Sequence, residues 1–261
     1  MTSAFLEVRG MSKSFGGNHA VRDISFEVGD GEIVGLIGPN GAGKTTCFNL
    51  ITGFNTPDAG SVRFRDEDVT ALKPYQIARK GIVRSFQKTN ILKGLTVFEN
   101  VLAGQYLAAK QPLWRTFFPG RAVARTEADA RDRAAEIVRT MGLAARINAP
   151  ASLLACGELR LLEVALALAA RPAILMLDEP AAGLNSHEAA RFGEVLRTLP
   201  GRRVQSVLIV EHNMGLVMGV CDRVVVMNFG QKLAEGRPAQ MQADARVIEA
   251  YLGGADPRLV A

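Results

Sequence analysis

The organising segment of this sequence reads Gly38-Pro39-Asn40-Gly41-Ala42-Gly43-Lys44-Thr45-Thr46. An apolar, strand-like run, residues 33–37, precedes it, and a helix-like run, residues 47–51, follows it. Strand, glycine-rich loop and helix in this order form the context of a phosphate-binding loop. Its backbone N–H groups wrap a triphosphate, its lysine reaches the β- and γ-phosphates, and the hydroxyl of Thr45 can bind Mg²⁺. We therefore expect all nine residues to bind a nucleotide. The alternative, a glycine-rich turn that fits by chance, is disfavoured by the flanking strand and helix.

Composition narrows the class of protein. The 261 residues are 48% apolar, which predicts a globular chain with one large core or two modest ones. The net charge of +5 would favour binding to nucleic acid or to an anionic membrane. However, no dense run of Lys and Arg with interleaved aromatic residues occurs, so we expect a solvated basic surface and no nucleic-acid partner.

Cysteine usage and hydropathy indicate a protein of a reducing compartment. The N-terminus shows no secretion signal, and the most apolar region, residues 161–177, is interrupted by charged residues and Pro172, which predicts helix, turn and strand rather than a membrane span. The three cysteines lie far apart and form no paired motif. They are Cys47, Cys156 and Cys221.

Two residues on predicted strands are candidates for contact with the nucleotide. Residues 5–37 alternate strand-like runs with turns, and Phe15 lies among them. Its ring can stack on adenine, or it is an ordinary core or edge phenylalanine. Residues 82–86 predict a strand that ends at Gln87, whose side-chain oxygen can bind Mg²⁺ or position water. The alternative is a solvated glutamine.

The middle of the chain predicts helices. Residues 96–109 and 125–141 have helical patterns, and the irregular segment between them carries aromatic residues around Trp114. This segment is interpreted as a contact surface or, equally, as local packing under a loop. We expect a helical subdomain inserted between two halves of the nucleotide fold.

Polar residues directly follow two predicted buried strands. The apolar run 173–177 ends in Asp178 and Glu179, and the run 206–210 is followed by Glu211 and His212. Carboxyl ends of parallel strands meet at one edge, so we expect these side chains beside the phosphate-binding loop. Asp178 would hold Mg²⁺ through water, Glu179 would polarise the attacking water, and His212 would donate to a γ-phosphate.

These patterns predict an α/β fold of the P-loop NTPase class. It has a mixed central sheet, an N-terminal antiparallel β edge and the inserted helical subdomain. The whole chain, residues 1–261, would form one ATPase domain. Within it, about 1–90 and 172–236 make the nucleotide-binding core, about 91–171 the helical subdomain, and 237–261 a C-terminal helical tail.

In these motifs the chain resembles the ATP-binding subunits of ABC transporters. Five elements agree in order and spacing over nearly the whole length. They are residues 38–46, Gln87, residues 154–158, residues 175–179 with 183–185, and His212. The runs 178–185, 210–214 and 247–253 further resemble the ATPases of branched-chain amino acid importers, and the insert around Trp114 is similar to the longer of that system's two ATPases.

The resemblance implies a cofactor, a location and partners. ATP with Mg²⁺ would be bound, and Phe15 would stack on the adenine. The subunit would lie on the cytoplasmic face of the bacterial inner membrane. It would work with a second ATPase subunit, two membrane-spanning permease subunits and, indirectly, a periplasmic solute-binding protein. The surface near residues 87–98 would receive short helices of the permease.

One segment departs from the family pattern. The family signature is Leu-Ser-Gly-Gly-Gln, or Leu-Ser-Tyr-Gly-Gln in this subfamily, and the aligned residues are Leu154-Ala155-Cys156-Gly157-Glu158. The resemblance implies that this signature segment contacts the γ-phosphate of the nucleotide in the partner ATPase. Ala155 cannot donate the hydrogen bond of the serine, and Glu158 suits the start of a helix but would repel phosphate. Cys156 is a small residue at this position or, alternatively, a redox switch.

We therefore expect an ATP hydrolase that powers import of a small solute, with Lys44, Glu179 and His212 as its catalytic groups. Because of the altered signature segment, we also expect an asymmetric pair with a different ATPase. The alternatives are a nucleotide-binding subunit with weak hydrolysis and a soluble ABC ATPase acting on ribosomes or DNA. The last usually has tandem domains or long coiled-coil insertions, and neither is present here.

Overall fold

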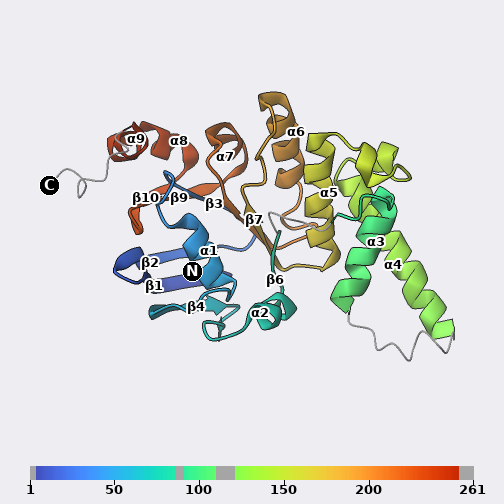
Figure 1. Cartoon of the computed structure of the whole chain (residues 1–261), viewed down its shortest axis with the longest axis horizontal. Coiled ribbons are helices and arrows are strands. Elements are labelled where there is room, and N and C mark those ends of the chain that lie inside the picture. The colour runs from blue at the N-terminus through green and yellow to red at the C-terminus, as the bar shows by residue number, and fades with distance from the viewer. Residues whose placement is uncertain (1–3, 86–90, 110–120, 253–261) are drawn as a thin grey trace.

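A six-stranded sheet forms the centre of the protein (Figure 1). The computed structural model describes residues 4–85, 91–109 and 121–252. The six strands are β3 (Ile33–Ile37), β6 (Ile82–Arg84), β7 (Ile174–Asp178), β8 (Ser206–Val210), β9 (Arg223–Asn228) and β10 (Gln231–Gly236). They lie in the order β10-β9-β3-β8-β7-β6, and all neighbours are parallel except β10, which runs antiparallel to β9. The predicted mixed central sheet is confirmed.

The N-terminal strands form a second sheet of their own. Its strands are β1 (Leu6–Phe15), β2 (Asn18–Val28), β4 (Ala59–Phe64) and β5 (Glu67–Asp68). They are antiparallel throughout and lie in the order β2-β1-β4-β5. This sheet is the antiparallel β edge expected from the sequence.

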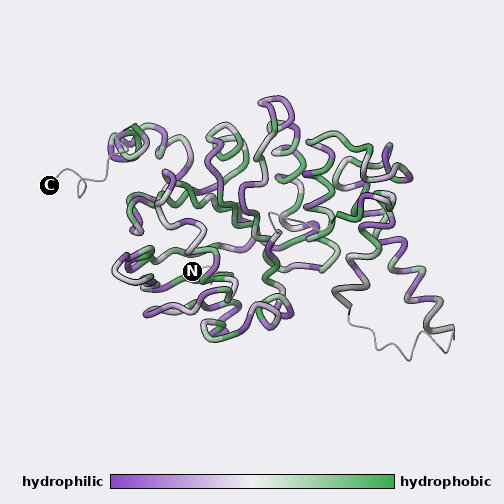
Figure 2. The backbone as a smooth tube through the Cα atoms, viewed as in Figure 1, coloured by the Kyte–Doolittle hydropathy of each residue, from purple (hydrophilic) through white to green (hydrophobic). Residues whose placement is uncertain are grey.

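Apolar side chains on both faces hold the central sheet in place. In β3, Ile33 and Ile37 belong to the core on one face, and Val34 and Leu36 to the core on the other. Because successive side chains of a strand point to opposite faces, a strand buried on both sides reads as a continuous apolar run. Figure 2 shows hydrophobic residues concentrated along these central strands, with hydrophilic residues on the outer turns and helices.

The helices fall into three groups. Around the central sheet lie α1 (Lys44–Ile51), α2 (Pro74–Lys80), α6 (Ser186–Arg197) and α7 (Met214–Val220). A helical subdomain stands at one side of the molecule (Figure 1) and contains α3 (Val97–Ala109), α4 (Arg121–Thr140) and α5 (Cys156–Ala169). The chain enters it after β6 and returns at β7, the neighbour of β6 in the sheet. The tail forms α8 (Pro238–Ala243) and α9 (Ala245–Leu252).

Most elements agree with the sequence patterns, and three differ in extent. The predicted strand 82–86 ends at Arg84, α4 begins at Arg121 rather than at 125, and the tail has two short helices where one was expected. Gln87, the insert around Trp114 and the residues after 252 lie outside the described residues. None of the described helices has the length and apolar content needed to cross a membrane.

Candidate active site

The glycine-rich loop lies at the carboxyl edge of the central sheet, between β3 and α1. Gly38 and Gly43 have φ angles of 150° and 95°. A Cβ atom at Gly38 would lie 2.1 Å from the carbonyl oxygen of Met227, and one at Gly43 would lie 2.3 Å from that of Ala20. Gly41 also has a positive φ, 82°, but nothing lies within 4 Å of its Cβ position. The loop therefore packs closely against β9 and β2 and leaves open space at Gly41.

Lys44 begins α1 and turns back onto the loop. Its Nζ donates to the carbonyl oxygens of Gly38, at 2.7 Å, and Pro39, at 2.9 Å. Burial lowers the pKa of this lysine, and the nearby carboxylates of Glu179 and Asp178 oppose that shift. The ammonium group is thus held over the loop in a position from which it can exchange two carbonyls for phosphate oxygens.

Asp178 ends β7 with its side chain almost fully buried, and Arg84 neutralises it. The guanidinium of Arg84, at the end of β6, donates to Oδ2 of Asp178 and, at 2.6 Å, to Oδ1 of Asn49 in α1. Oδ1 of Asp178 is buried and has no hydrogen-bond partner among the residues that the structure describes. An unpaired buried carboxylate oxygen is costly, so this atom is suited to a bound cation or its water shell.

Glu179 and His212 lie close together at the ends of neighbouring strands. Oε1 of Glu179 lies 3.7 Å from Nδ1 of His212. Glu179 has a φ of 46°, and its N–H donates to the carbonyl oxygen of Val210 at 2.8 Å, which ties the end of β7 to the end of β8. Both side chains are partly exposed, so both can reach a bound molecule at this edge of the sheet.

The remaining predicted nucleotide and metal residues are placed as follows. Thr45 is exposed at the start of α1, and Thr46 is half-buried beside it. Phe15 is 50% exposed at the end of β1, which excludes a core phenylalanine and leaves the stacking and edge interpretations open. Gln87 lies outside the described residues. In the part of the chain that the structure describes, no three His, Cys, Asp or Glu residues group into a metal site.

The signature segment leads into α5, and the carboxylate of its glutamate accepts two hydrogen bonds from within the chain. Oε2 of Glu158 accepts from the N–H of Ala155 at 3.0 Å, and Oε1 accepts from Nε of Arg146 at 3.0 Å. Partial burial opposes ionisation of Glu158, but these two hydrogen bonds outweigh it and lower the pKa of the carboxyl. Ala155 is the N-cap residue and has no side-chain acceptor for the helix N–H groups. Glu158 thus supplies the glutamate half of a capping box at the start of α5, whereas the half that a serine would supply is missing.

The same helix contacts the loop that follows Glu179. Arg160 donates from Nε and from its terminal nitrogen to the carbonyl oxygen of Ala182, at 3.2 and 3.0 Å. Sγ of Cys156 lies 3.8 Å from the carbonyl oxygen of Gly183. Cys156 is exposed, so neither of its two interpretations is excluded. The signature segment and the loop of Glu179 therefore pack as neighbours within one chain.

Sequence reasoning assigned no role to three charged residues of this region: Arg84, Arg160 and Glu211. Arg84 was visible as the only charged residue of a short apolar strand, and Glu211 as the immediate neighbour of His212. Arg84 pairs with Asp178, 94 positions away, and Glu211 accepts from Ala181, 30 positions away, so no local pattern identifies these contacts.

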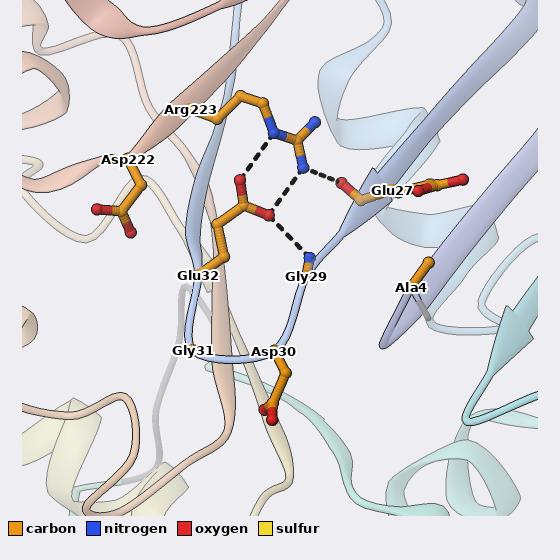
Figure 3. Close-up of a pocket in the computed structure, with 8 residues that line it drawn as sticks. All are labelled: Ala4, Glu27, Gly29, Asp30, Gly31, Glu32, Asp222 and Arg223. Atoms are coloured by element: carbon orange, nitrogen blue, oxygen red, sulfur yellow. Dashed lines mark hydrogen bonds and ion pairs between the residues drawn. The ribbon is translucent and has the colours of Figure 1, made fainter. Parts of the chain in front are cut away.

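A pocket of about 490 Å³ lies at the opposite edge of the sheet, where β3 and β9 begin (Figure 3). At its wall Arg223 donates to both oxygens of Glu32, at 2.7 and 2.8 Å, and to the carbonyl oxygen of Glu27, at 2.8 Å. Glu32 also accepts the N–H of Gly29 at 2.8 Å. Burial opposes ionisation of Glu32, but its partners outweigh this and lower the pKa of the carboxyl. The pocket is separated from the phosphate loop by the length of β3, and Arg223 at its wall is paired with Glu32.

Comparison with known proteins places this site in a family. A family profile described as "ABC transporter" matches residues 21–182. The chain belongs to the ABC transporter family. A second profile, described as "Branched-chain amino acid ATP-binding cassette transporter", matches residues 231–257 of this ABC chain.

Relatives match this ABC chain over almost its full length. The high-affinity branched-chain amino acid transport ATP-binding protein LivG of Escherichia coli K12 is 43% identical over 98% of this chain and 100% of its own. BraF of Pseudomonas aeruginosa, which has the same descriptive name, is 41% identical over the same shares. A crystal structure of an ATP-binding cassette in its ADP conformation has a TM-score of 0.84 and 32% identity, covering 97% of this chain and 100% of its own. The P-loop α/β fold and the nucleotide-binding class are thereby confirmed.

Proposed function

We propose that this chain is the ATP-hydrolysing subunit of a bacterial importer for branched-chain or other small amino acids. The observation that carries the proposal is the full-length similarity to LivG and BraF. The profile over residues 231–257 agrees with it. The convergence of Lys44, Asp178, Glu179 and His212 on one edge of the sheet supplies the chemistry that hydrolysis requires.

The phosphate loop would hold the nucleotide. The backbone N–H groups of residues 38–46 would surround the β- and γ-phosphates at the N-terminus of α1. Lys44 would exchange its hydrogen bonds to the carbonyls of Gly38 and Pro39 for ion pairs with the phosphates. Because the ammonium group is partly buried, its attraction to a phosphate is stronger than it would be in water. Phe15 would stack on the adenine from the end of β1.

Mg²⁺ fits the residues present. Thr45 is exposed at the start of α1, and Asp178 presents a buried oxygen that no described residue hydrogen-bonds, so these two would hold the ion, Asp178 through water. Gln87 would add a third oxygen. The ion would neutralise charge that develops on the phosphates.

Glu179 and His212 would act on the reacting atoms. Glu179 would accept a proton from the attacking water, and His212 would donate a hydrogen bond to the γ-phosphate. Their 3.7 Å separation allows both to reach one phosphate from neighbouring strands. The cycle would close and open a pair of ATPase subunits and so move the membrane partner.

The assembly would contain a second ATPase subunit, two permease subunits and, indirectly, a periplasmic solute-binding protein. It would lie on the cytoplasmic face of the inner membrane and would not bind nucleic acid. Ala155 supports pairing with a different ATPase rather than with a second copy of this chain. Because Ala155 lacks the signature hydroxyl, this chain would contribute only weakly to the ATP site that contains the partner's phosphate loop. In that case one site of the pair hydrolyses ATP poorly while the site at this chain's own Lys44 is competent.

Transport in cells tests the proposed function. A strain that lacks this gene would be complemented with the wild-type chain or with Glu179→Gln, and uptake of labelled leucine, isoleucine and valine would be measured. We expect uptake with the wild type and none with Glu179→Gln at equal protein abundance. Equal uptake by the deletion strain and the complemented strain, for these and for other amino acids, would contradict the proposal.

A further inference from the structure

Glu211, the residue between β8 and His212, is fully buried. Its carboxylate accepts three backbone N–H groups. Oε1 accepts from Ala181 at 2.8 Å, and Oε2 accepts from His212 at 2.8 Å and from Asn213 at 2.9 Å. A buried carboxylate costs much free energy unless it is hydrogen-bonded, and these donors fix its orientation as well as satisfying it.

The three donors belong to two different loops. Ala181 lies two residues after Glu179, in the loop that follows β7, whereas His212 and Asn213 begin the segment that follows β8. One carboxylate therefore joins the main chain beside Glu179 to the main chain of His212. The hydrogen bond from the N–H of Glu179 to Val210 makes a second link between the same two strand ends.

These links surround the two groups to which the proposed function gives the hydrolytic chemistry. The side chains of Glu179 and His212 are partly exposed and only 3.7 Å apart, so their separation depends on the backbones that carry them. The next residue of the first loop, Ala182, is held from the other side by Arg160 of α5. Among these backbone hydrogen bonds, those accepted by Glu211 join the main chain of this loop to the main chain of His212.

We propose that Glu211 is a positioning residue for hydrolysis, which holds the loop of Glu179 and the backbone of His212 in a fixed relation. The inference rests on the proposed function, since it assigns Glu211 a part in the reaction of Glu179 and His212. Glu211 itself lies in the interior and acts only through these two residues.

The chemistry requires a carboxylate of this length. Glu211→Gln keeps the size, but its amide has one acceptor oxygen, and its NH₂ group would face backbone N–H donors. At least one loop then loses its anchor. Glu211→Asp keeps the charge but is one methylene shorter and cannot span both loops. Displacement of a catalytic group by about 1 Å costs up to about a hundredfold in rate, so we expect kcat to fall at least about tenfold in either variant.

The test uses the transporter complex purified, through a tag on this full-length chain, from the cells that encode it. Steady-state ATP hydrolysis gives kcat and KM, and Glu179→Gln defines the background rate. Glu32→Gln is the matched control, because Glu32 also accepts a backbone N–H but lies at the opposite edge of the sheet (Figure 3). We expect Glu211→Gln to lose at least about tenfold in kcat, with KM for ATP within about twofold and Glu32→Gln unchanged in kcat.

The outcomes separate this inference from the proposed function. A wild-type rate equal to the Glu179→Gln background would contradict the function itself. A wild type above background with folded Glu211→Gln at the same kcat would overturn the inference alone. If Glu211→Gln does not fold, Glu211→Asp is measured by the same criterion. If neither folds, Glu211 is a structural residue and the assignment is wrong.

Discussion

Arg84 at the end of β6 neutralises Asp178 at the end of β7 through Oδ2 alone, and no other described residue hydrogen-bonds Oδ1. The guanidinium also donates to Asn49 and lies over the rings of Phe48 and Phe54, 5.5 and 5.8 Å from their centroids. The carboxylate is therefore fixed in orientation with its second oxygen available. Asp178 is the carboxylate that we propose holds the cation through water, so Arg84 would determine how its second oxygen faces that cation.

Replacement of Arg84 should destabilise the nucleotide-free protein. Arg84→Met leaves the buried Asp178 without its positive partner, which costs about 3 kcal/mol in the free energy of unfolding. Urea unfolding without nucleotide measures the loss. The control is Arg9→Met, because Arg9 pairs with Glu7 on the surface and should cost less than about 1 kcal/mol. A second substitution, Asp178→Asn, should recover most of the stability of Arg84→Met. Equal losses in the free energy of unfolding for Arg84→Met and Arg9→Met would show that the buried pair stabilises the protein no more than the surface pair.

Glu179→Gln should abolish turnover but keep nucleotide binding. Removal of a general base costs about 10²–10⁴-fold in rate. The Glu179 side chain is partly exposed, so its replacement by glutamine should affect stability little. ATP hydrolysis by the complex and ATP binding by the chain measure the two effects. Glu188→Gln is the control, since Glu188 caps α6 through the N–H of Asn185 and should leave kcat unchanged. Turnover by Glu179→Gln above one tenth of the wild-type rate would exclude it as the base.

Ala155→Ser should both stabilise the chain and raise turnover at the partner's site. A serine at the N-cap of α5 accepts a helix N–H, which contributes about 1 kcal/mol. Its hydroxyl also restores the donor that the family signature presents to phosphate. Thermal unfolding and ATP hydrolysis by the complex measure these effects, with Ala155→Gly as the control that adds no hydroxyl. If both variants hydrolyse ATP at the wild-type rate, the altered signature segment is a working variant and the asymmetric pair is not required.

Glu158→Gln should lower stability, although the sequence alone suggested that it would relieve repulsion. The carboxylate caps α5 and pairs with Arg146, and the amide loses the charge of both interactions. The pKa of Glu158 is lowered in the folded state, so its stabilising effect is present above the pKa of the unfolded chain and is lost as pH falls through the folded pKa. Urea unfolding of wild type and variant at pH 7 and at pH 3 checks the sign. We expect a difference at pH 7 that shrinks at pH 3, and a difference that is constant with pH would contradict it.

Local sequence was sufficient for those parts of the site that lie within a few residues of one another. The phosphate loop is specified by glycines next to a strand and a helix, and Asp178, Glu179 and His212 by their places directly after apolar runs. The cap of α6 is also local, because Asn185 and Glu188 exchange hydrogen bonds within one turn. Such features depend on spacing along the chain, and spacing is what a sequence displays.

Contacts between strand ends depended on which strands become neighbours. Arg84 meets Asp178 because β6 pairs with β7, and Glu211 reaches Ala181 because β7 pairs with β8. Those pairings follow from the packing of two apolar faces against helices that are distant in the chain. A charged residue next to an apolar run is visible in the sequence, but its partner is chosen by the fold, since the free energy of a buried charge depends on whatever group lies within hydrogen-bond distance of it.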